Sequence, residues 1–414
     1  MEADNASPHS IRRGPSPVTY LPTAEHDELR AMVRELAVER IAPRAAEIDA
    51  TAEFPRDLKD LLAKQDLLGA GFEERHGGSA LDTMGQAIVA EEIARADATT
   101  SLIPIVQKLG SLPILLAGSD EQKDRYLPRL ASGEWLIAFA LTEAAAGSDV
   151  ASNRMRARLD GDCYVLNGSK RFITHGSVAD VLIAFALTDP DAGGRKGMSA
   201  FIVEAKTPGF GVARVEHKMG IRGSPTAELN FDDVRVPVEN RLGAEGEGFH
   251  IAMDTLDRSR LSIAAQAVGI AQGAIDEAVR YAADRKQFDQ RVIDFEGIQF
   301  MLADMVSQTE AARQLTYAAA ARVDADASDL AYWTSCAKLI AGDTAMRVTT
   351  DAVQVLGGYG YITEYPVERM MRDAKITQLY EGTQQIQRLI IARQILQRAG
   401  VGATPPSQQE QPRT

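Results

Sequence analysis

The chain has 414 residues, of which 45% are hydrophobic and 25% are charged, and its formal net charge is −13. This length exceeds what one hydrophobic core usually holds, so we expect two or three domains. The acidic balance argues against a nucleic-acid-binding protein, which would present a basic face.

The residue types also argue against several kinds of site. Cys163 and Cys336 are the only cysteines and lie far apart in sequence, so a disulfide framework is excluded and a reducing, cytoplasmic location is expected. The six histidines are scattered, and we predict no metal site. No run approaches the roughly 18 apolar residues of a membrane span, and the first residues do not resemble a secretory signal.

The first region is predicted to be a helical domain over residues 18–135, after a flexible tail at 1–17. Apolar residues repeat at helical spacing from Leu29 to Leu36, and Pro43 ends that run. Further helices are predicted around 58–62, 88–93 and 121–130. The pattern therefore favours a packed group of helices.

The second region, 136–240, has the pattern of a small β domain. An apolar run covers 136–142, and residues 163–174 read as strand, Asn167–Gly168 turn and strand, because Asn-Gly is typical of two-residue hairpin turns. Strands are also predicted at 181–187, 199–204, 212–217 and 227–236. We expect an antiparallel barrel or sandwich.

The third region, 241–400, returns to helical spacing. Long helices are predicted at 249–284, 295–325, 328–356 and 383–398, followed by a second flexible tail at 401–414. Four long helices with short links indicate an antiparallel four-helix bundle. The fold class is thus α+β with several domains, and ligand sites are expected at the domain junctions.

Common nucleotide and hydrolase motifs are missing from the sequence. It contains no G-x-G-x-x-G after a strand, no G-x-x-x-x-G-K-[ST] loop and no G-x-S-x-G elbow. Nicotinamide-binding, P-loop and hydrolase functions are therefore disfavoured.

Four short clusters could carry chemistry, and each also has a simpler structural explanation. The loop 141–149 is rich in small residues that let backbone N–H groups approach an anion, or it is a tight surface loop. Residues 172–174 could be an ordinary strand. Gly357 and Gly358 could be a helix C-cap, and Thr383 could simply cap the next helix.

Together with Arg285-Lys-Gln-Phe288, the order and spacing of these clusters resemble the acyl-CoA dehydrogenase family, over residues 20–398. The strings KMGIRGSPTAELNFDDVRVP (218–237) and RMMRDAKITQLYEGTQQIQ (369–387) carry the resemblance further. The short-chain and bacterial acyl-CoA branch is the most similar.

The resemblance implies FAD bound between the β domain and the bundle, in a homodimer or homotetramer with shared sites. The implied FAD contacts are Phe139, Leu141, Thr142, Gly147, Ser148, Phe172, Ile173, Thr174, Arg285, Phe288, Glu296, Gln354, Gly357, Gly358, Thr383 and Gln385. Of these, Arg285, Phe288, Gln354, Gly357 and Gly358 would grip the ADP portion of the neighbouring subunit's FAD. The implied substrate contacts are Ser148, Asp257, Arg260 and Gly382.

Glu381 matches the family's catalytic base. The α-hydrogen of a thioester is weakly acidic, so the base must be positioned and its pKa raised, which burial would do. The β-hydrogen would leave as hydride to flavin N5, giving the trans-2-enoyl-CoA. The backbone N–H of Glu381 and the flavin ribityl hydroxyl would bind the thioester carbonyl. One branch of the family, which includes isovaleryl-CoA dehydrogenase, places its base near Arg260, where this chain has Ser259, which is no base.

The expected activity is acyl-CoA dehydrogenation in fatty acid metabolism, with electrons passed to an electron-transferring flavoprotein. An oxygen-using acyl-CoA oxidase and a non-catalytic FAD- or thioester-binding homologue are the alternatives. Two departures from the family pattern bear on FAD: Glu296 stands where a Gln is usual, and Asp289 where a Gly is usual.

Overall fold

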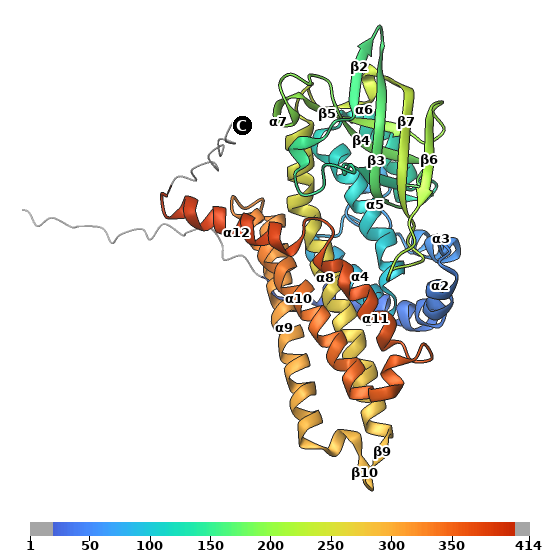
Figure 1. Cartoon of the computed structure of the whole chain (residues 1–414), viewed down its shortest axis with the longest axis vertical. Coiled ribbons are helices and arrows are strands. Elements are labelled where there is room, and N and C mark those ends of the chain that lie inside the picture. The colour runs from blue at the N-terminus through green and yellow to red at the C-terminus, as the bar shows by residue number, and fades with distance from the viewer. Residues whose placement is uncertain (1–19, 402–414) are drawn as a thin grey trace, which may run out of the picture.

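The computed structural model describes residues 20–401. The predicted tail at 1–17, and the predicted tail at 401–414 apart from Val401, lie outside the described residues. Helices come first in the chain, a sheet follows, and long helices complete it (Figure 1). The predicted fold class is confirmed.

Six α-helices form the first region: α1 (Ala24–Leu36), α2 (Ala45–Thr51), α3 (Arg56–Lys64), α4 (Thr83–Ala96), α5 (Ala98–Ala117) and α6 (Asp120–Ala131). The sequence patterns predicted α1, α3, α4 and α6 but missed α2 and α5. Side chains set several starts: Thr23 and His26 form a capping box at α1, and Asp82 accepts the N–H of Gly85 at α4.

Helix α5 escaped prediction because Pro104 and Pro113, which normally interrupt helices, lie inside it. The helix is 20 residues long, and an 18-residue window within it has a mean hydropathy of 1.4. By length and composition alone this would be enough to cross a membrane. However, 72% of that window is buried against the rest of the protein, as in a core helix.

The β region contains one connected sheet of eight strands: β1 (Ile137–Ala140), β2 (Arg156–Asp160), β3 (Cys163–Thr174), β4 (Val181–Leu187), β5 (Met198–Glu204), β6 (Phe210–Val215), β7 (Thr226–Pro237) and β8 (Arg241–Leu242). Its order is β6-β7-β3-β2-β4-β5-β8, and β1 pairs with β4. The β1–β4 pairing is parallel, so the sheet is mixed rather than purely antiparallel. The one-turn helix α7 (Gly194–Gly197) precedes β5.

The predicted hairpin turn at Asn167–Gly168 is wrong. The β2–β3 turn lies at Gly161 and Asp162, and β3 runs on through Asn167 and Gly168 with a register shift against β7. Asn167 and Asp233 exchange hydrogen bonds at 2.9 Å across that irregularity. Long-range pairing with β7 therefore overrides the local turn signal.

The last region holds α8 (Gly248–Asp284), α9 (Glu296–Asp324), α10 (Leu330–Leu356), α11 (Val367–Ala374) and α12 (Gln384–Arg398). A short hairpin of β9 (Lys286–Gln287) and β10 (Gln290–Arg291) joins α8 to α9. The four long helices match the prediction, and α11 was missed. Figure 1 shows α8 running beside α4, α9 and α10.

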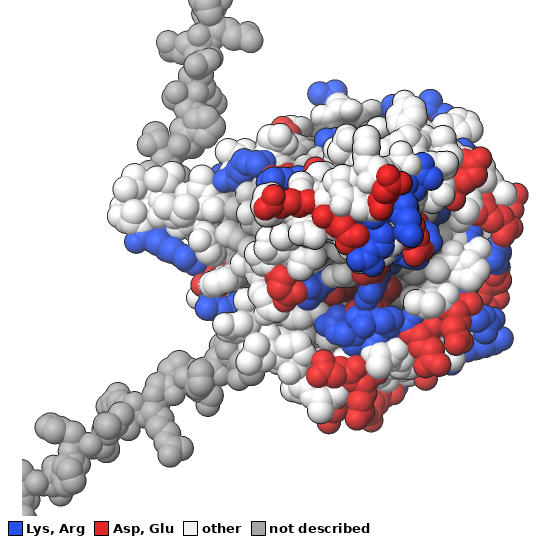
Figure 2. Space-filling model, turned by 90° about the horizontal axis from the view of Figure 1, so that it is seen from below, with Lys and Arg blue, Asp and Glu red and all other residues white. Residues whose placement is uncertain are grey.

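Close helix contact explains two glycines of α8. A Cβ on Gly269 would lie 2.1 Å from the carbonyl oxygen of Glu91, and one on Gly273 would lie 2.3 Å from that of Arg95. Both contacts are with α4, so glycine lets these helices approach and brings the N-terminal helices onto the bundle. On the face seen in Figure 2, acidic and basic side chains are interspersed rather than separated.

Candidate functional site

Glu381 lies in the short link before α12, and its backbone is unusual. Its φ is +50°, a left-handed value that is rare for a residue with a side chain, and Gly382 follows with φ +89°. Such a conformation persists only where the surroundings hold it. The link therefore has the character of a constrained functional loop.

Ser259 of α8 touches the carboxyl group of Glu381. Its hydroxyl donates to Glu381 Oε2 at 2.7 Å. Ser259 cannot itself act as a base. The structure gives it a different part, because a hydroxyl donated to a carboxylate favours the charged form.

The pKa of Glu381 is raised because burial of its carboxyl disfavours the charged form. The Ser259 hydrogen bond and the nearby cations Arg260, Lys338 and Lys108 act in the opposite direction. As a whole residue Glu381 is half-buried, since part of it still borders open space. A carboxylate whose pKa is raised is a stronger base than an ordinary one, so it is better suited to accept a proton.

Lys338 of α10 holds this link in place through hydrogen bonds. Its side chain is fully buried and donates to the carbonyl oxygen of Gly382 at 2.7 Å and to Gln384 Oε1 at 3.2 Å. Gln387 adds hydrogen bonds to the carbonyl oxygens of Glu381 and Gly382. The sequence analysis missed Lys338, although a lysine within an otherwise apolar helical stripe is a signal that could have found it.

Asp257 and Arg260, the predicted CoA contacts, form an ion pair with each other on α8. Arg260 donates to Asp257 Oδ1 at 2.6 Å and to Ser335 at 3.3 Å, and it is only 4% exposed. Burial raises the pKa of Asp257, and Arg260 opposes that shift. Arg260 thus sits beside Glu381, while the CoA contact stays a prediction.

The loop after β1 is held by a buried ion pair that the sequence analysis also missed. Lys170 of β3 donates to Glu143 Oε1 at 2.8 Å and to the carbonyl oxygen of Leu141 at 3.0 Å. Burial lowers the pKa of Lys170 to about 8. This pair fixes the backbone of the loop while Thr142 stays half-buried and Gly147 and Ser148 are exposed.

Phe172, Ile173 and Thr174 lie at the end of β3, but they do not form an ordinary strand. The register against β7 shifts between Lys170 and Ile173, and Phe172 has φ +58°. The Phe172 ring is 58% exposed, whereas Ile173 is buried. The bulge therefore turns one aromatic ring outward, beside the loop that Lys170 holds.

A separate cleft of about 540 Å³ brings together Arg285, Gly357 and Gly358, three of the predicted ADP contacts. The Arg285 guanidinium lies over the Tyr359 ring, 5.3 Å from its centre. Gly357 ends α10, as one interpretation allowed, and its φ is +58°. A Cβ on either glycine would meet nothing within 4 Å, so their backbone is open to a ligand.

The other predicted ADP contacts do not line this cleft. Phe288 is 90% exposed at the turn between β9 and β10, where both Phe288 and Asp289 have positive φ. The positive φ of Asp289 explains why the family pattern usually has glycine at that position. Glu296 is the exposed first residue of α9, and Gln354 is exposed on α10. Neither is brought next to Arg285 within residues 20–401.

Thr383 and Gln385 lie at the start of α12. The Thr383 side chain accepts the N–H of Ile386 at 3.3 Å, so it is an N-cap, as the simpler interpretation proposed. Gln385 is exposed. Thr383 therefore stabilises the start of α12, and the contact of both residues with FAD stays a prediction.

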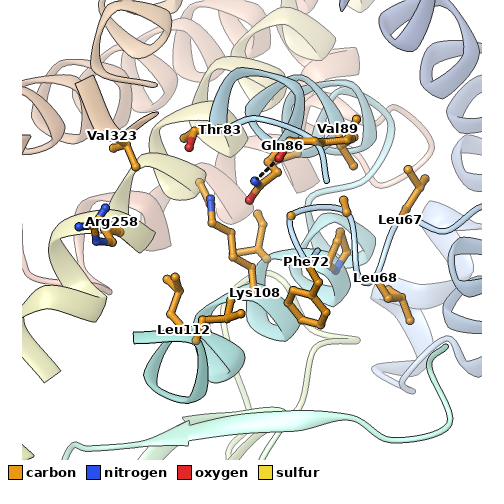
Figure 3. A pocket seen from close by; sticks show the side chains of 18 of the residues that line it. Leu67, Leu68, Phe72, Thr83, Gln86, Val89, Lys108, Leu112, Arg258 and Val323 are labelled. Carbon is orange, nitrogen blue, oxygen red and sulfur yellow. Dashed lines mark hydrogen bonds between the residues drawn. The ribbon is translucent and has the colours of Figure 1, made fainter. Parts of the chain in front are cut away.

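An internal cavity of about 330 Å³ opens between α4, α5 and α8. Its lining includes Arg258 and Ser262, which flank the Ser259 that binds Glu381. Most of the other walls are apolar (Figure 3). The cavity therefore lies within one helical turn of Ser259, which touches the candidate base Glu381. Its volume is large enough for an acyl chain.

Comparison with known proteins gives matches over nearly all of the described chain. The acyl-CoA dehydrogenase N-terminal, middle and C-terminal domain families match residues 23–134, 138–234 and 246–396. The probable acyl-CoA dehydrogenase FadE25 of Mycobacterium tuberculosis is 49% identical over 90% of this chain and 95% of that protein.

Two solved structures show the same architecture. Butyryl-CoA dehydrogenase from Megasphaera elsdenii has a TM-score of 0.88 and 43% identity, covering 91% of this chain and 99% of that one. A chain from a structure described as the electron transferring flavoprotein of Acidaminococcus fermentans has a TM-score of 0.89 and 44% identity, with coverage of 91% and 99%. Similarity at this level extends to sequence as well as fold.

Proposed function

The chain belongs to the acyl-CoA dehydrogenase family, whose members are oxidoreductases, and we propose that it is FAD-dependent and desaturates an acyl-CoA to the trans-2-enoyl-CoA. The observation that carries the proposal is the placement of Glu381. Its carboxyl has a raised pKa, lies on a constrained link and accepts a hydrogen bond from Ser259, whose helix neighbours Arg258 and Ser262 line a cavity of about 330 Å³.

The residues present fit an FAD. The open backbone at Gly147, Gly357 and Gly358 has room for a ligand, since a Cβ there would meet nothing within 4 Å. Arg285 supplies a cation beside Gly357 and Gly358. Thr142 and the outward Phe172 ring would hold the ring system, and Ser148 of the same loop would lie by the thioester-linked arm of the substrate. Arg285 with Gly357 and Gly358 would hold the ADP portion of the neighbouring subunit's FAD. Bound FAD would accept the β-hydride and so supply the redox chemistry.

Glu381 would take the α-proton onto its carboxylate. Ser259 keeps that carboxylate oriented, while burial keeps the pKa high enough for the proton to be held. The backbone N–H of Glu381 has no hydrogen-bond acceptor within residues 20–401. It is therefore free to donate to the thioester carbonyl, where negative charge develops as the proton leaves.

We further propose that the electrons pass to an electron-transferring flavoprotein and that the protein works in the cytoplasm, in fatty acid metabolism. The likeness to a chain described with such a flavoprotein supports the first point. A homodimer or homotetramer is proposed because Arg285 directly precedes β9, and Figure 1 shows β9 and β10 at the end of the bundle away from the β region, far from the start of α12 where Glu381 lies.

The test is anaerobic titration of the purified protein with a panel of acyl-CoA thioesters. The protein should be yellow, and its flavin absorbance should bleach with at least one thioester and recover on adding an electron-transferring flavoprotein. Peroxide production in air at the same rate would favour an oxidase. A yellow protein that no thioester bleaches would favour a non-catalytic binder.

A further inference from the structure

Lys108 of α5 stands out among the lysines because it has no partner. Burial lowers the pKa of Lys108, Lys170, Lys218 and Lys338, in each case to about 8. The last three donate hydrogen bonds to protein oxygens. Lys108 forms no hydrogen bond or ion pair with any residue from 20 to 401. Lys108 is half-buried and its Nζ reaches open space, so the ammonium is available to a ligand that carries the opposite charge.

The Lys108 side chain borders the internal cavity described above. Figure 3 places it near the middle of the labelled lining residues, among Phe72, Leu112 and other apolar side chains. The pKa of about 8 leaves the ammonium mostly protonated at neutral pH. The cavity therefore has mostly apolar walls and contains one ammonium group that no residue from 20 to 401 hydrogen-bonds.

Other charges around the cavity are already engaged. Arg258 donates to Asp326 at 2.5 Å. Asp324 accepts the backbone N–H of Thr83 at 3.0 and 3.2 Å, at the N-terminus of α4. Asp324 and Glu381 act on Lys108 only at longer range, each raising its pKa. Neither carboxylate accepts a hydrogen bond from the ammonium.

Thr83 and Ser262 also line this cavity, and neither hydroxyl forms a hydrogen bond with a residue from 20 to 401. A ligand group that could satisfy a lysine and a hydroxyl together is a hydrogen-bond acceptor with negative charge. A plain alkyl chain could not, since it would leave the ammonium buried beside hydrocarbon.

We propose that the substrates of this enzyme are acyl thioesters whose chain ends in a carboxylate, bound by Lys108. This inference rests on the proposed function, because it takes the cavity beside Ser259 and Glu381 as the acyl site. The thioester end would lie at Glu381 and the distal carboxylate at Lys108, with apolar walls around the methylenes between them. Specificity would come from the cost of leaving the lysine unpaired with any other chain end.

The test uses length-matched pairs, hexanoyl-CoA with adipoyl-CoA and octanoyl-CoA with suberoyl-CoA. Dissociation constants are measured by calorimetry on the FAD-loaded enzyme in a Glu381→Gln background, so that ligand is not consumed. In one or both pairs the carboxylate-ended member should bind more tightly. Lys108→Met should weaken its binding by about 10- to 100-fold and leave the methyl-ended member unchanged or tighter.

Lys64→Met, at an exposed lysine of α3, is the matched control for a lost positive charge and should change neither constant. Thermal unfolding shows whether Lys108→Met is folded. If that variant does not fold, the preference of the Glu381→Gln protein for the carboxylate-ended member of each pair decides the question by itself. Tighter binding of the methyl-ended member in both pairs, or equal weakening of both members by Lys108→Met, overturns the inference.

Flavin reduction separates this inference from the proposed function. Bleaching of the wild-type flavin by methyl-ended thioesters alone, without any effect of Lys108→Met, would reject the inference and keep the dehydrogenase. A Lys108-dependent binding preference in a protein whose flavin no thioester bleaches would reject the dehydrogenase and keep the binding site.

Discussion

The link that carries Glu381 and the cleft at Arg285 are built in opposite ways. The link is held from several sides, by Lys338, Gln387 and Ser259, and its unusual backbone depends on those hydrogen bonds. The cleft has fewer supporting contacts. Phe288 is 90% exposed, and a Cβ on Gly357 or Gly358 would meet no protein atom within 4 Å. One chain therefore fixes the proposed base completely, whereas the proposed ADP contacts have a free side that a second subunit would cover.

Lys338→Met should have the largest effect among variants outside the base itself. It removes one of the two donors to the carbonyl of Gly382 and leaves the amide oxygen of Gln384 without its donor, at a cost of about 1–3 kcal/mol for that unpaired group. We expect a lower melting temperature and flavin reduction slowed by about tenfold or more, with FAD affinity little changed.

Lys170→Met is the matched variant, because Lys170 braces the loop at Leu141 and Glu143 instead. It should weaken FAD binding more than it slows reduction of the flavin that does bind. Stopped-flow reduction and FAD titration of both variants sharpen the contrast. Identical profiles for the two lysine variants would contradict separate roles for the two loops.

Ser259→Ala should change the pH dependence of flavin reduction. The lost hydrogen bond had favoured the carboxylate, so the pKa of Glu381 rises further. Reduction requires the carboxylate and is lost as pH falls through that pKa, so the acidic limb of the rate profile should move to higher pH. The rate on the high-pH plateau should fall only a few-fold. An acidic limb that stays in place or moves to lower pH counts against this role.

Glu296→Gln should have the smallest effect and should bind FAD at least as tightly as the wild type. Glu296 is exposed at the start of α9, does not line the Arg285 cleft and forms no ion pair within residues 20–401. Its charge would repel a pyrophosphate in a shared site, and the amide would not. Equilibrium titration that finds clearly weaker FAD binding in the variant would refute this prediction.

Local sequence signals predicted the long helices and most strands because apolar spacing records which face is buried. The same signals failed where contacts between residues far apart in sequence determine the local structure. Asn167–Gly168 looked like a turn until pairing with β7 carried β3 through it, and two prolines concealed the core helix α5. Within the site, Glu381 was found from its motif. Ser259, Lys338 and Lys170 act through contacts that only the folded chain brings together.

The central claim is that the carboxylate of Glu381 removes the α-proton. The most direct test uses a 3-thiaacyl-CoA deuterated at its α carbon, because sulfur at the β position leaves no hydride to transfer and isolates the proton step. By NMR, the wild-type protein should exchange the α-deuterium with water, and Glu381→Gln should slow this exchange by at least about 100-fold while still binding FAD and the ligand. Exchange at the wild-type rate in Glu381→Gln would contradict the account.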